Sequence, residues 1–213
     1  RQMCIRDSPQ TDKIIKEFGN WRVTNACIHR KPVDKPLKDI INVLTSGKFN
    51  TYHRFYDDVF HLAVIFEIQQ NGQTRYLLTE KRPNIFWKQV NGLDDYPGSD
   101  KLPIKLGSFK HITLGQMLEE CKKIMGDKFA KYNAKDNNCQ IYILALFDAF
   151  FKLAGVGSTM SIIKNYIYQD MTPYLTDLSV DIATKVTDLG HTFNRILYGA
   201  GARRQKPRVA FRL

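Results

Sequence analysis

Residues 132–153 form the most informative stretch of this 213-residue chain: Tyr-Asn-Ala-Lys-Asp-Asn-Asn-Cys-Gln-Ile-Tyr-Ile-Leu-Ala-Leu-Phe-Asp-Ala-Phe-Phe-Lys-Leu. Asp and Asn side chains favour helix starts, because their oxygens accept hydrogen bonds from the unpaired backbone N–H groups there. The residues after the Asp-Asn-Asn triplet are apolar on nearly all sides, which is typical of a helix buried at the centre of a domain. We therefore expect a buried helix from Cys139 to about Leu153.

Cys139 lies in the first turn of this expected helix. The free N–H groups and the partial positive charge at a helix N-terminus lower the pKa of a thiol, so the thiolate is available near neutral pH. The same N–H groups can hold the oxyanion that forms when a thiolate attacks a carbonyl. Cys139 is therefore a candidate nucleophile and its own N–H a candidate oxyanion donor. The alternative is a buried structural cysteine, a common role for this residue in cores.

A β-hairpin is expected upstream of this helix. Val59–Gln69 is rich in β-branched and aromatic residues and predicts a strand, and Thr74–Lys81 predicts a second one. The Asn-Gly pair at 71–72 favours a two-residue turn between them. With this turn, residues opposite each other have numbers that sum to 143. Glu80 then lies diagonal to His61 on the same face of the hairpin.

His61 is the candidate general base, because a thiol nucleophile usually needs a histidine and this one lies within the strongest strand pattern. Glu80 could orient the imidazole and stabilise its charged form, as the third member of a triad does. Two alternatives stay open. His61 could be a core histidine bonded to a backbone carbonyl, and Glu80 could be a solvated carboxylate that pairs with Lys81 or Arg82. Thr79 falls on the opposite face and is the weaker candidate.

A histidine in a strand, a hairpin, and an Asn-Cys pair at the start of an apolar helix resemble the circularly permuted papain-like group. This group includes the lecithin:retinol acyltransferase-like proteins, permuted NlpC/P60 enzymes and PPPDE peptidases. The match covers about Tyr56–Leu153 and is carried by His61 in Tyr-Asp-Asp-Val-Phe-His-Leu and Cys139 in Asn-Asn-Cys-Gln. The usual His-x-Gly is His-Leu-Ala here, which leaves the third catalytic member and the substrate open. The layout also resembles uncharacterised proteins of eukaryotic DNA viruses.

The resemblance implies an α+β fold, in which an antiparallel sheet packs on the buried helix that bears the cysteine, and acyl transfer through a thioester. His61 would take the proton of Cys139, and backbone N–H groups at Cys139 and Gln140 would hold the oxyanion. A hydrolase, acyltransferase or phospholipase acting on acyl-lipids fits, and so does a peptidase acting on peptide or isopeptide amides. We rank acyl-lipids slightly ahead because the neighbours of the histidine are apolar: Phe60, Ala63 and Ile65.

The chain divides into four expected parts. Residues 1–8 resemble a string that recurs at the ends of translated transcriptome assemblies, and we expect them to be non-native or disordered. A permuted papain-like domain follows over 9–155, with its end at the Gly-Val-Gly-Ser break, then a helical extension over 156–198 and a basic disordered tail over 199–213. An amphipathic stripe over 178–198 suits docking on the domain, a helix-mediated oligomer, or a membrane surface.

Other elements are expected within the first two folded parts. Helices are predicted over 34–47 and 160–169. A capping box, Thr113 with Gln116, predicts a further helix that Gly126 closes. The stretch 84–106 is predicted to be a loop, and 109–112 is predicted to be a short strand.

The composition restricts the classes of function. With 43% hydrophobic residues and 25% charged residues, a disordered or collagen-like chain is excluded. Lys and Arg number 32 against 21 Asp and Glu, so the net charge is +11. The tail carries five positive charges and no acid, which favours contact with nucleic acid or an anionic membrane through phosphate groups: Arg203, Arg204, Lys206, Arg208 and Arg212. A non-catalytic virion or packaging module is therefore the alternative from a different class.

Four cysteines occur without a Cys-x-x-Cys pair or a regular spacing. Neither a zinc site nor a disulfide framework is indicated, and we expect no cofactor and no metal. Free thiols favour a reducing compartment, namely the cytoplasm or a virion.

Overall fold

The structure, a computed structural model, describes residues 9–32, 60–82, 84–132, 137–157 and 159–167. In this part of the chain, five antiparallel strands form one sheet in the order β4-β3-β2-β1-β5. The strands are β1 (Arg22–Pro32), β2 (Phe60–Gln70), β3 (Gln73–Lys81), β4 (Ile85–Val90) and β5 (Asp100–Lys105). With the helices that pack on the sheet, this is an α+β fold, as the sequence predicts.

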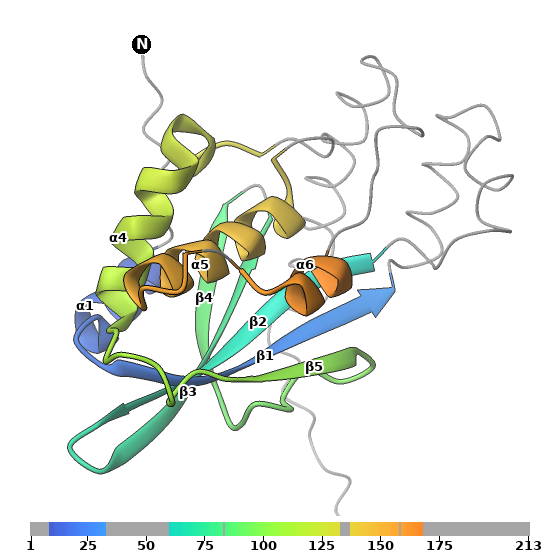
Figure 1. Ribbon diagram of the computed structural model, residues 1–213. Coiled ribbons are helices and arrows are strands. Elements are labelled where there is room, and N and C mark those ends of the chain that lie inside the picture. Colours follow the sequence, from blue (N-terminus) through green and yellow to red (C-terminus); the bar gives the residue numbers. More distant parts are fainter. Residues whose placement is uncertain (1–8, 33–59, 83, 133–136, 158, 168–213) are drawn as a thin grey trace, which may run out of the picture.

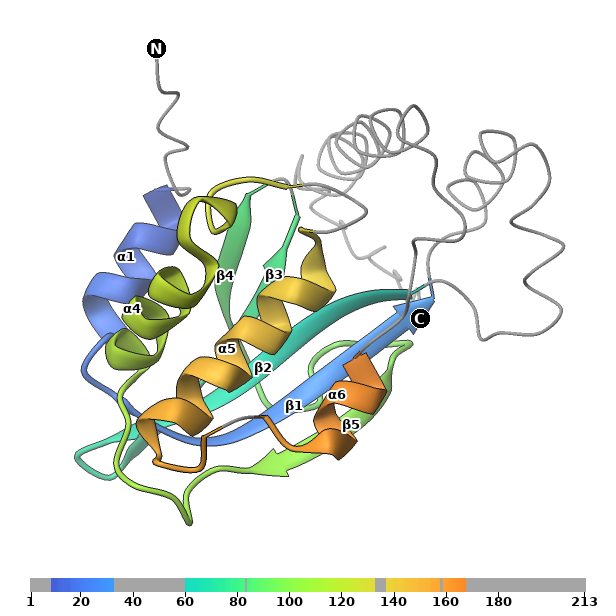
Figure 2. The same cartoon turned by 45° about the horizontal axis from the view of Figure 1, so that its top comes forward.

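The helices of the described residues are α1 (Pro9–Phe18), α4 (Leu114–Met125), the short 3-10 turn η1 (Gly126–Lys128), α5 (Cys139–Leu153) and α6 (Ser161–Ile167). Helices α4, α5 and α6 lie over one face of the sheet (Figure 1), and α5 runs obliquely across β2 and β3 (Figure 2). Helix α5 begins and ends where the sequence predicts. No helix in this described part is long and apolar enough to span a membrane.

The hairpin of β2 and β3 confirms the predicted turn and register. Asn71 and Gly72 both have positive φ, 50° and 74°, as a two-residue turn of type I′ requires. Gln70 pairs with Gln73, and every further pair of the ladder keeps the same sum of residue numbers. The Asn-Gly turn thus fixes which face of the sheet each side chain of the hairpin occupies.

The capping box of α4 is also confirmed. Thr113 Oγ1 accepts a hydrogen bond from the Gln116 N–H at 3.2 Å, and Gln116 Oε1 accepts one from the Thr113 N–H at 2.9 Å. Gly126, with φ of 52°, ends the helix. Local side-chain chemistry therefore sets both ends of α4.

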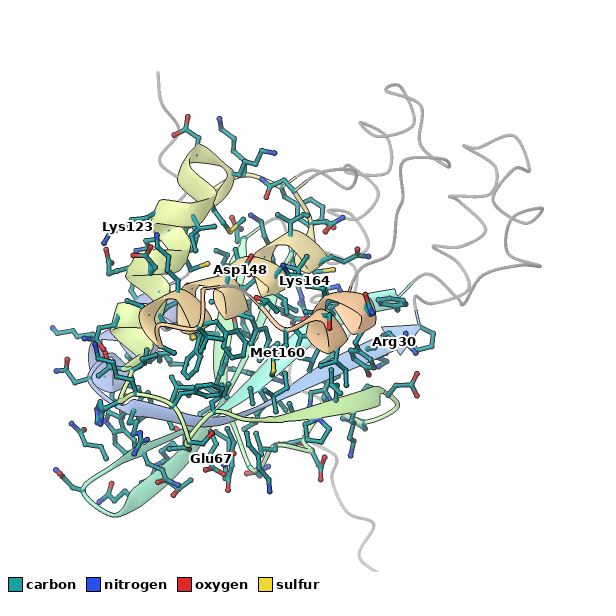
Figure 3. The ribbon with its side chains drawn as sticks, viewed as in Figure 1. Arg30, Glu67, Lys123, Asp148, Met160 and Lys164 are labelled. Atoms are coloured by element: carbon teal, nitrogen blue, oxygen red, sulfur yellow. The ribbon has the colours of Figure 1, made fainter. Side chains whose placement is uncertain are left out.

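The two faces of the sheet are covered differently. Leu62 and Phe66 of β2 pack against the helices in the main hydrophobic cluster. His61 and Ile65 alternate with them and belong to the other face, and Figure 3 shows Glu67, from the same set, on the side away from α5. Ile65 is nevertheless fully buried, so this second face is covered as well.

Residues 91–99 supply part of that cover. Strands β4 and β5 lie at opposite edges of the sheet, so the chain that joins them must cross a face. Figures 1 and 2 show it on the side away from α5. His29 of β1 holds it there: Nε2 donates to the Leu93 carbonyl oxygen at 2.8 Å, and Nδ1 lies 2.9 Å from Ser99 Oγ. We call residues 91–99 the crossover.

The prediction of a loop over 84–106 is wrong at both ends, where β4 and β5 form the edges of the sheet. An edge strand leaves one row of its backbone N–H and C=O groups unpaired and often carries polar residues and proline, so its sequence resembles that of a loop. The sequence of β5, for example, is Asp-Lys-Leu-Pro-Ile-Lys. The short strand expected over 109–112 is also wrong, because only an isolated bridge between Arg22 and Thr113 forms nearby.

Helix α6 lies beyond the expected domain boundary at 155–158 but packs on the same core. Ile163 and Ile167 are fully buried in the hydrophobic cluster that contains α5. Asp148 of α5, marked in Figure 3, accepts hydrogen bonds from the backbone N–H and the hydroxyl of Thr159. The division into domain, extension and tail stays a prediction. Four predicted segments, 1–8, 34–47, 178–198 and 199–213, lie outside the described residues.

The replacement Ile163→Ala is expected to lower the free energy of unfolding by about 2–5 kcal/mol, because it removes a fully buried side chain and leaves a cavity. Its neighbour Ile162, 60% exposed on the same helix, is the matched control, and Ile162→Ala should change stability little. Urea unfolding of both variants measures the difference. Equal, small effects would show that α6 does not contribute to the core.

Candidate active site

The start of α5 meets the sheet where β2 and β3 separate. Pairing between these strands ends at Val64 and Thr79. Just beyond this point His61 stands on β2, and its side chain forms a hydrogen bond with Cys139, the first residue of α5. The structure thus brings together two predicted site residues that are 78 positions apart in the sequence.

Glu80 is the next group in this chain of contacts. His61 Nε2 lies 2.7 Å from Glu80 Oε2, so Nδ1 is the ring nitrogen left for Cys139. The side chain of Glu80 is only 2% exposed, which excludes the solvated carboxylate. Glu80 also forms an ion pair with Arg82 through its other oxygen. The predicted contact between Glu80 and His61 is therefore present, and so is the alternative pairing of Glu80 with Arg82.

Thr79 lies on the opposite face, as expected. Its hydroxyl is 3.1 Å from the hydroxyl of Tyr142 of α5, and it also donates to the Phe86 carbonyl oxygen. These contacts tie β3 to the helix and keep Thr79 away from the imidazole of His61.

A backbone donor from β2 reaches the sulfur of Cys139. In a two-residue hairpin, the two residues that flank the turn each donate a backbone hydrogen bond to the other. The N–H of Gln70 is therefore directed toward β3. Because the direction alternates along a strand, the N–H of every second residue before Gln70 is directed toward β3 as well. Leu62 belongs to this series but lies beyond the last pair, Val64 and Thr79. Its N–H donates to Cys139 instead. The separation of the strands therefore creates a donor that favours the thiolate.

Electrostatics favour a thiolate–imidazolium pair. Burial by itself lowers the pKa of His61 and raises that of Cys139, because it penalises charge on both groups. Each group offers the other an opposite charge and a hydrogen bond. Together these effects on the pKa values are larger than the effect of burial. The pKa of His61 is raised as a result and that of Cys139 is lowered.

Glu80 remains ionised in this buried setting. Burial raises its pKa, but the hydrogen bond and charge of His61, with the charge of Arg82, bring the pKa down to about 2. The other two described cysteines contrast with Cys139. Burial raises the pKa of Cys27 to about 11 and that of Cys121 to about 12.

Two asparagines fix the start of α5. Asn138 is the N-cap, and its Oδ1 accepts from the N–H of Gln140 at 2.9 Å and from that of Ile141 at 3.3 Å. The Gln140 N–H is thus already used by the cap. The oxyanion role expected for the N–H groups of Cys139 and Gln140 stays a prediction.

Asn137 anchors the residue before the cap. Its Nδ2 donates to the carbonyl oxygens of Lys128 and Lys131, and its Oδ1 accepts from the buried ammonium of Lys81 at 3.1 Å. Lys81 also donates to the carbonyl oxygens of Lys128 and Phe129. Asn137 therefore joins the start of α5 to the end of β3 and to the turn after α4.

Sequence reasoning did not single out Tyr96 of the crossover, whose ring contacts that of His29 with 5.5 Å between centroids, and whose pKa is raised by burial and by the negative charge of Glu80. Tyr96 falls within the stretch 84–106, for which the sequence predicts only a loop. No local pattern could reveal the contact, because it depends on the crossover passing over the sheet.

The apolar neighbours of His61 do not line an open surface. Ala63 and Ile65 are fully buried beneath the second face, and Phe60 is 8% exposed in the main core. They therefore behave as core residues, which removes one reason for ranking acyl-lipids first. Within the described ranges, no group of three His, Cys, Asp or Glu side chains could hold a metal ion.

Comparisons with protein-family models, with curated proteins and with solved structures found no match to this chain.

Proposed function

We propose that this protein is a cysteine-dependent acyl-transfer enzyme that acts through a thioester. Cys139 is the nucleophile, His61 the general base and acid, and Glu80 the carboxylate that orients the imidazole. The observation that carries the proposal is the hydrogen-bonded chain from thiol to imidazole to carboxylate. A structural cysteine needs neither a charged partner nor a raised imidazole pKa beside it.

The reaction begins from the thiolate–imidazolium pair. Sγ of Cys139 attacks the substrate carbonyl carbon, and the carbonyl π electrons move to oxygen, where the Cys139 N–H stabilises the negative charge. The C–O or C–N bond then breaks as His61 gives its proton to the leaving alcohol or amine. This leaves an acyl thioester on Cys139 and a neutral imidazole.

Deacylation reverses the roles. His61 removes a proton from water or from an acceptor alcohol, whose oxygen attacks the thioester carbonyl. The C–S bond breaks, the thiolate leaves, and the imidazolium that remains restores the starting pair. Throughout, Glu80 holds the ring so that Nδ1 faces the sulfur.

The same observations support a permuted papain-like fold as part of this proposal. His61 precedes Cys139 in the chain, the histidine lies in a strand of an antiparallel sheet, and the cysteine starts a buried helix. The carboxylate of Glu80, on the adjacent strand, would be the third catalytic residue. The His-Leu-Ala sequence at 61–63 left the identity of that residue open.

The substrate class is proposed only as an ester or amide of a carboxylic acid. A membrane or nucleic-acid partner rests on residues 178–213, which lie outside the described residues. A non-catalytic packaging module is the outcome that remains if no thioester forms.

Trapping the acyl-enzyme tests the proposal. The full chain is incubated with phosphatidylcholine or phosphatidylserine vesicles, or with peptide and isopeptide amides, quenched in acid and analysed by peptide mass spectrometry. We expect an acyl adduct on Cys139 with one of these classes and none in Cys139→Ala. A fatty-acyl adduct would identify a lipid hydrolase or acyltransferase, and a peptidyl adduct a peptidase. No adduct with any substrate, together with binding of DNA or anionic vesicles, would favour the packaging module.

A further inference from the structure

A lysine side chain is buried at the end of β3, next to the site. Lys81 is only 1% exposed, although an ammonium group is costly to remove from water. It is the last residue of β3 and lies beyond Thr79, where the pairing with β2 ends. Side chains alternate along a strand, so Lys81 shares the helix side of the sheet with Thr79, whereas Glu80 is directed to the other side. A buried cation at this place needs a reason.

Three acceptors surround the ammonium of Lys81. Its Nζ donates to the carbonyl oxygens of Lys128 at 2.8 Å and Phe129 at 3.1 Å, and to Asn137 Oδ1 at 3.1 Å. An ammonium has three N–H donors, so these acceptors match it in number. The two carbonyl groups belong to the last residue of η1 and its C-cap, where helix carbonyls lack partners within the helix and attract a cation. Burial lowers the pKa of Lys81 to about 8, so the group is still mostly protonated at neutral pH.

The same contacts decide the orientation of the Asn137 amide. Its Oδ1 faces the ammonium, and its Nδ2 donates to the carbonyl oxygens of Lys128 at 2.8 Å and Lys131 at 2.7 Å. The reversed amide would turn N–H groups toward the ammonium and oxygen toward the carbonyls, so only one orientation satisfies these groups. Asn137 is 3% exposed and directly precedes Asn138, the N-cap of α5. The ammonium therefore fixes the residue before the cap from the side of the strand.

The Glu80-Lys81 pair of β3 is thus attached to both halves of the candidate catalytic pair. Glu80 Oε2 lies 2.7 Å from the Nε2 of His61 on one side of the sheet. On the other side Lys81 holds Asn137, two residues before Cys139. Both residues of β3 are paired with β4, so their spacing is fixed. This strand therefore connects the imidazole and the start of α5 by a short, rigid path.

We propose that Lys81 is a positioning residue of the active site, whose ammonium anchors the start of α5 through Asn137. The anchor keeps the sulfur of Cys139 in place beside the imidazole of His61. The inference deepens the proposed function and rests on it for any effect on turnover. Its structural content, that the ammonium maintains the thiolate–imidazolium pair, is measurable without a substrate.

Alkylation of Cys139 by iodoacetamide, followed against pH in the full chain, tests the inference. The midpoint of the rate–pH curve reports the pKa of the thiol, whereas accessibility of the sulfur scales the whole curve. The variant Lys81→Met keeps an apolar stem and removes the ammonium. We expect its midpoint to move upward by about one pH unit, a tenfold loss of thiolate below the midpoint, because a displaced sulfur loses part of the charge and hydrogen bond of His61. Peptide mass spectrometry assigns the adducts to Cys139.

A second variant, Asn137→Ala, breaks the same anchor and leaves the ammonium its two carbonyl acceptors. Its midpoint should also move upward, and it decides the question if Lys81→Met does not fold. In the double variant the two shifts should not add, because both act through one contact. Lys152→Met is the matched control: this lysine joins the other end of α5 to Glu120 at 2.6 Å and should leave the midpoint unchanged. Ile163→Ala, which weakens the core at α6, is the control for stability.

The outcomes separate the anchor from a general loss of stability and from the proposed reaction. Wild-type midpoints in Lys81→Met and Asn137→Ala would overturn the inference, even if an acyl adduct forms on Cys139. An equal upward shift in Ile163→Ala would overturn it too, because lost stability would then explain the effect. If no substrate gives an acyl adduct while the midpoint rises only in the two anchor variants, the proposed reaction fails but the positioning role of Lys81 stands.

Discussion

Replacement of Cys139 by alanine should lower turnover of the substrate identified by acyl trapping by at least about 10⁴-fold. The reason is chemical: no other group at the start of α5 can form the thioester, and the oxyanion donor and substrate binding alone supply only a small part of the rate. The side chain is small, so the fold should persist. Initial rates of the variant and the wild type, with thermal unfolding of both, measure the effect.

Cys27→Ala is the matched control, because it removes another buried thiol that has a raised pKa and no imidazole partner. It should keep wild-type turnover within a few-fold. Equal losses in the two variants would indicate damage to the fold rather than to the chemistry. Undiminished turnover in Cys139→Ala would exclude Cys139 as the nucleophile.

Replacement of His61 by glutamine should slow alkylation of Cys139 by iodoacetamide at pH 6.5 by about 10²-fold or more. Without the imidazolium, burial, the largest effect, is opposed mainly by the Leu62 N–H donor, and the pKa of Cys139 returns toward the ordinary range for a thiol. At pH 6.5 such a thiol is less than about 1% thiolate, and only the thiolate reacts. The alkylation rate of the variant should then rise about tenfold per pH unit, while that of the wild type should rise less steeply because the pKa of its Cys139 is lowered.

Cys27 and Cys121 are internal controls in the same experiment, because burial already raises the pKa of each. Their alkylation should be slow at pH 6.5 and the same in both proteins. A Cys4→Ser background removes the fourth thiol, and adducts are assigned by peptide mass spectrometry. If Cys139 reacts equally fast with and without His61, the imidazole does not activate it.

Much of the site follows from local sequence. The Asn-Gly turn fixes the hairpin register, and the register alone places Glu80 diagonal to His61. The Asn-Asn-Cys sequence sets the start of α5, because Asn138 satisfies the first free N–H groups of the helix. Each of these inferences depends on residues that are close together in the chain. The local sequence is therefore sufficient to predict the hairpin register and the start of the helix.

The three strands outside the hairpin were not predictable in the same way. Strand β1 carries a mixed sequence, Arg-Val-Thr-Asn-Ala-Cys-Ile-His-Arg-Lys-Pro, in which apolar and polar residues do not alternate strictly. Strands β4 and β5 are short and partly polar. What makes these segments strands is pairing with a partner far away in the chain, which local propensity does not record.

The sequence by itself determined the hairpin, the buried helix and the pairing of histidine with glutamate, because each depends on a turn, a cap or a register. Tertiary structure alone decided that Cys139 meets His61 where β2 and β3 part, that the Leu62 N–H reaches the sulfur, and that the crossover is held against β1 by His29. The physical reason for the crossover is the strand order: β4 and β5 stand at opposite edges, so the chain between them has to cross the sheet.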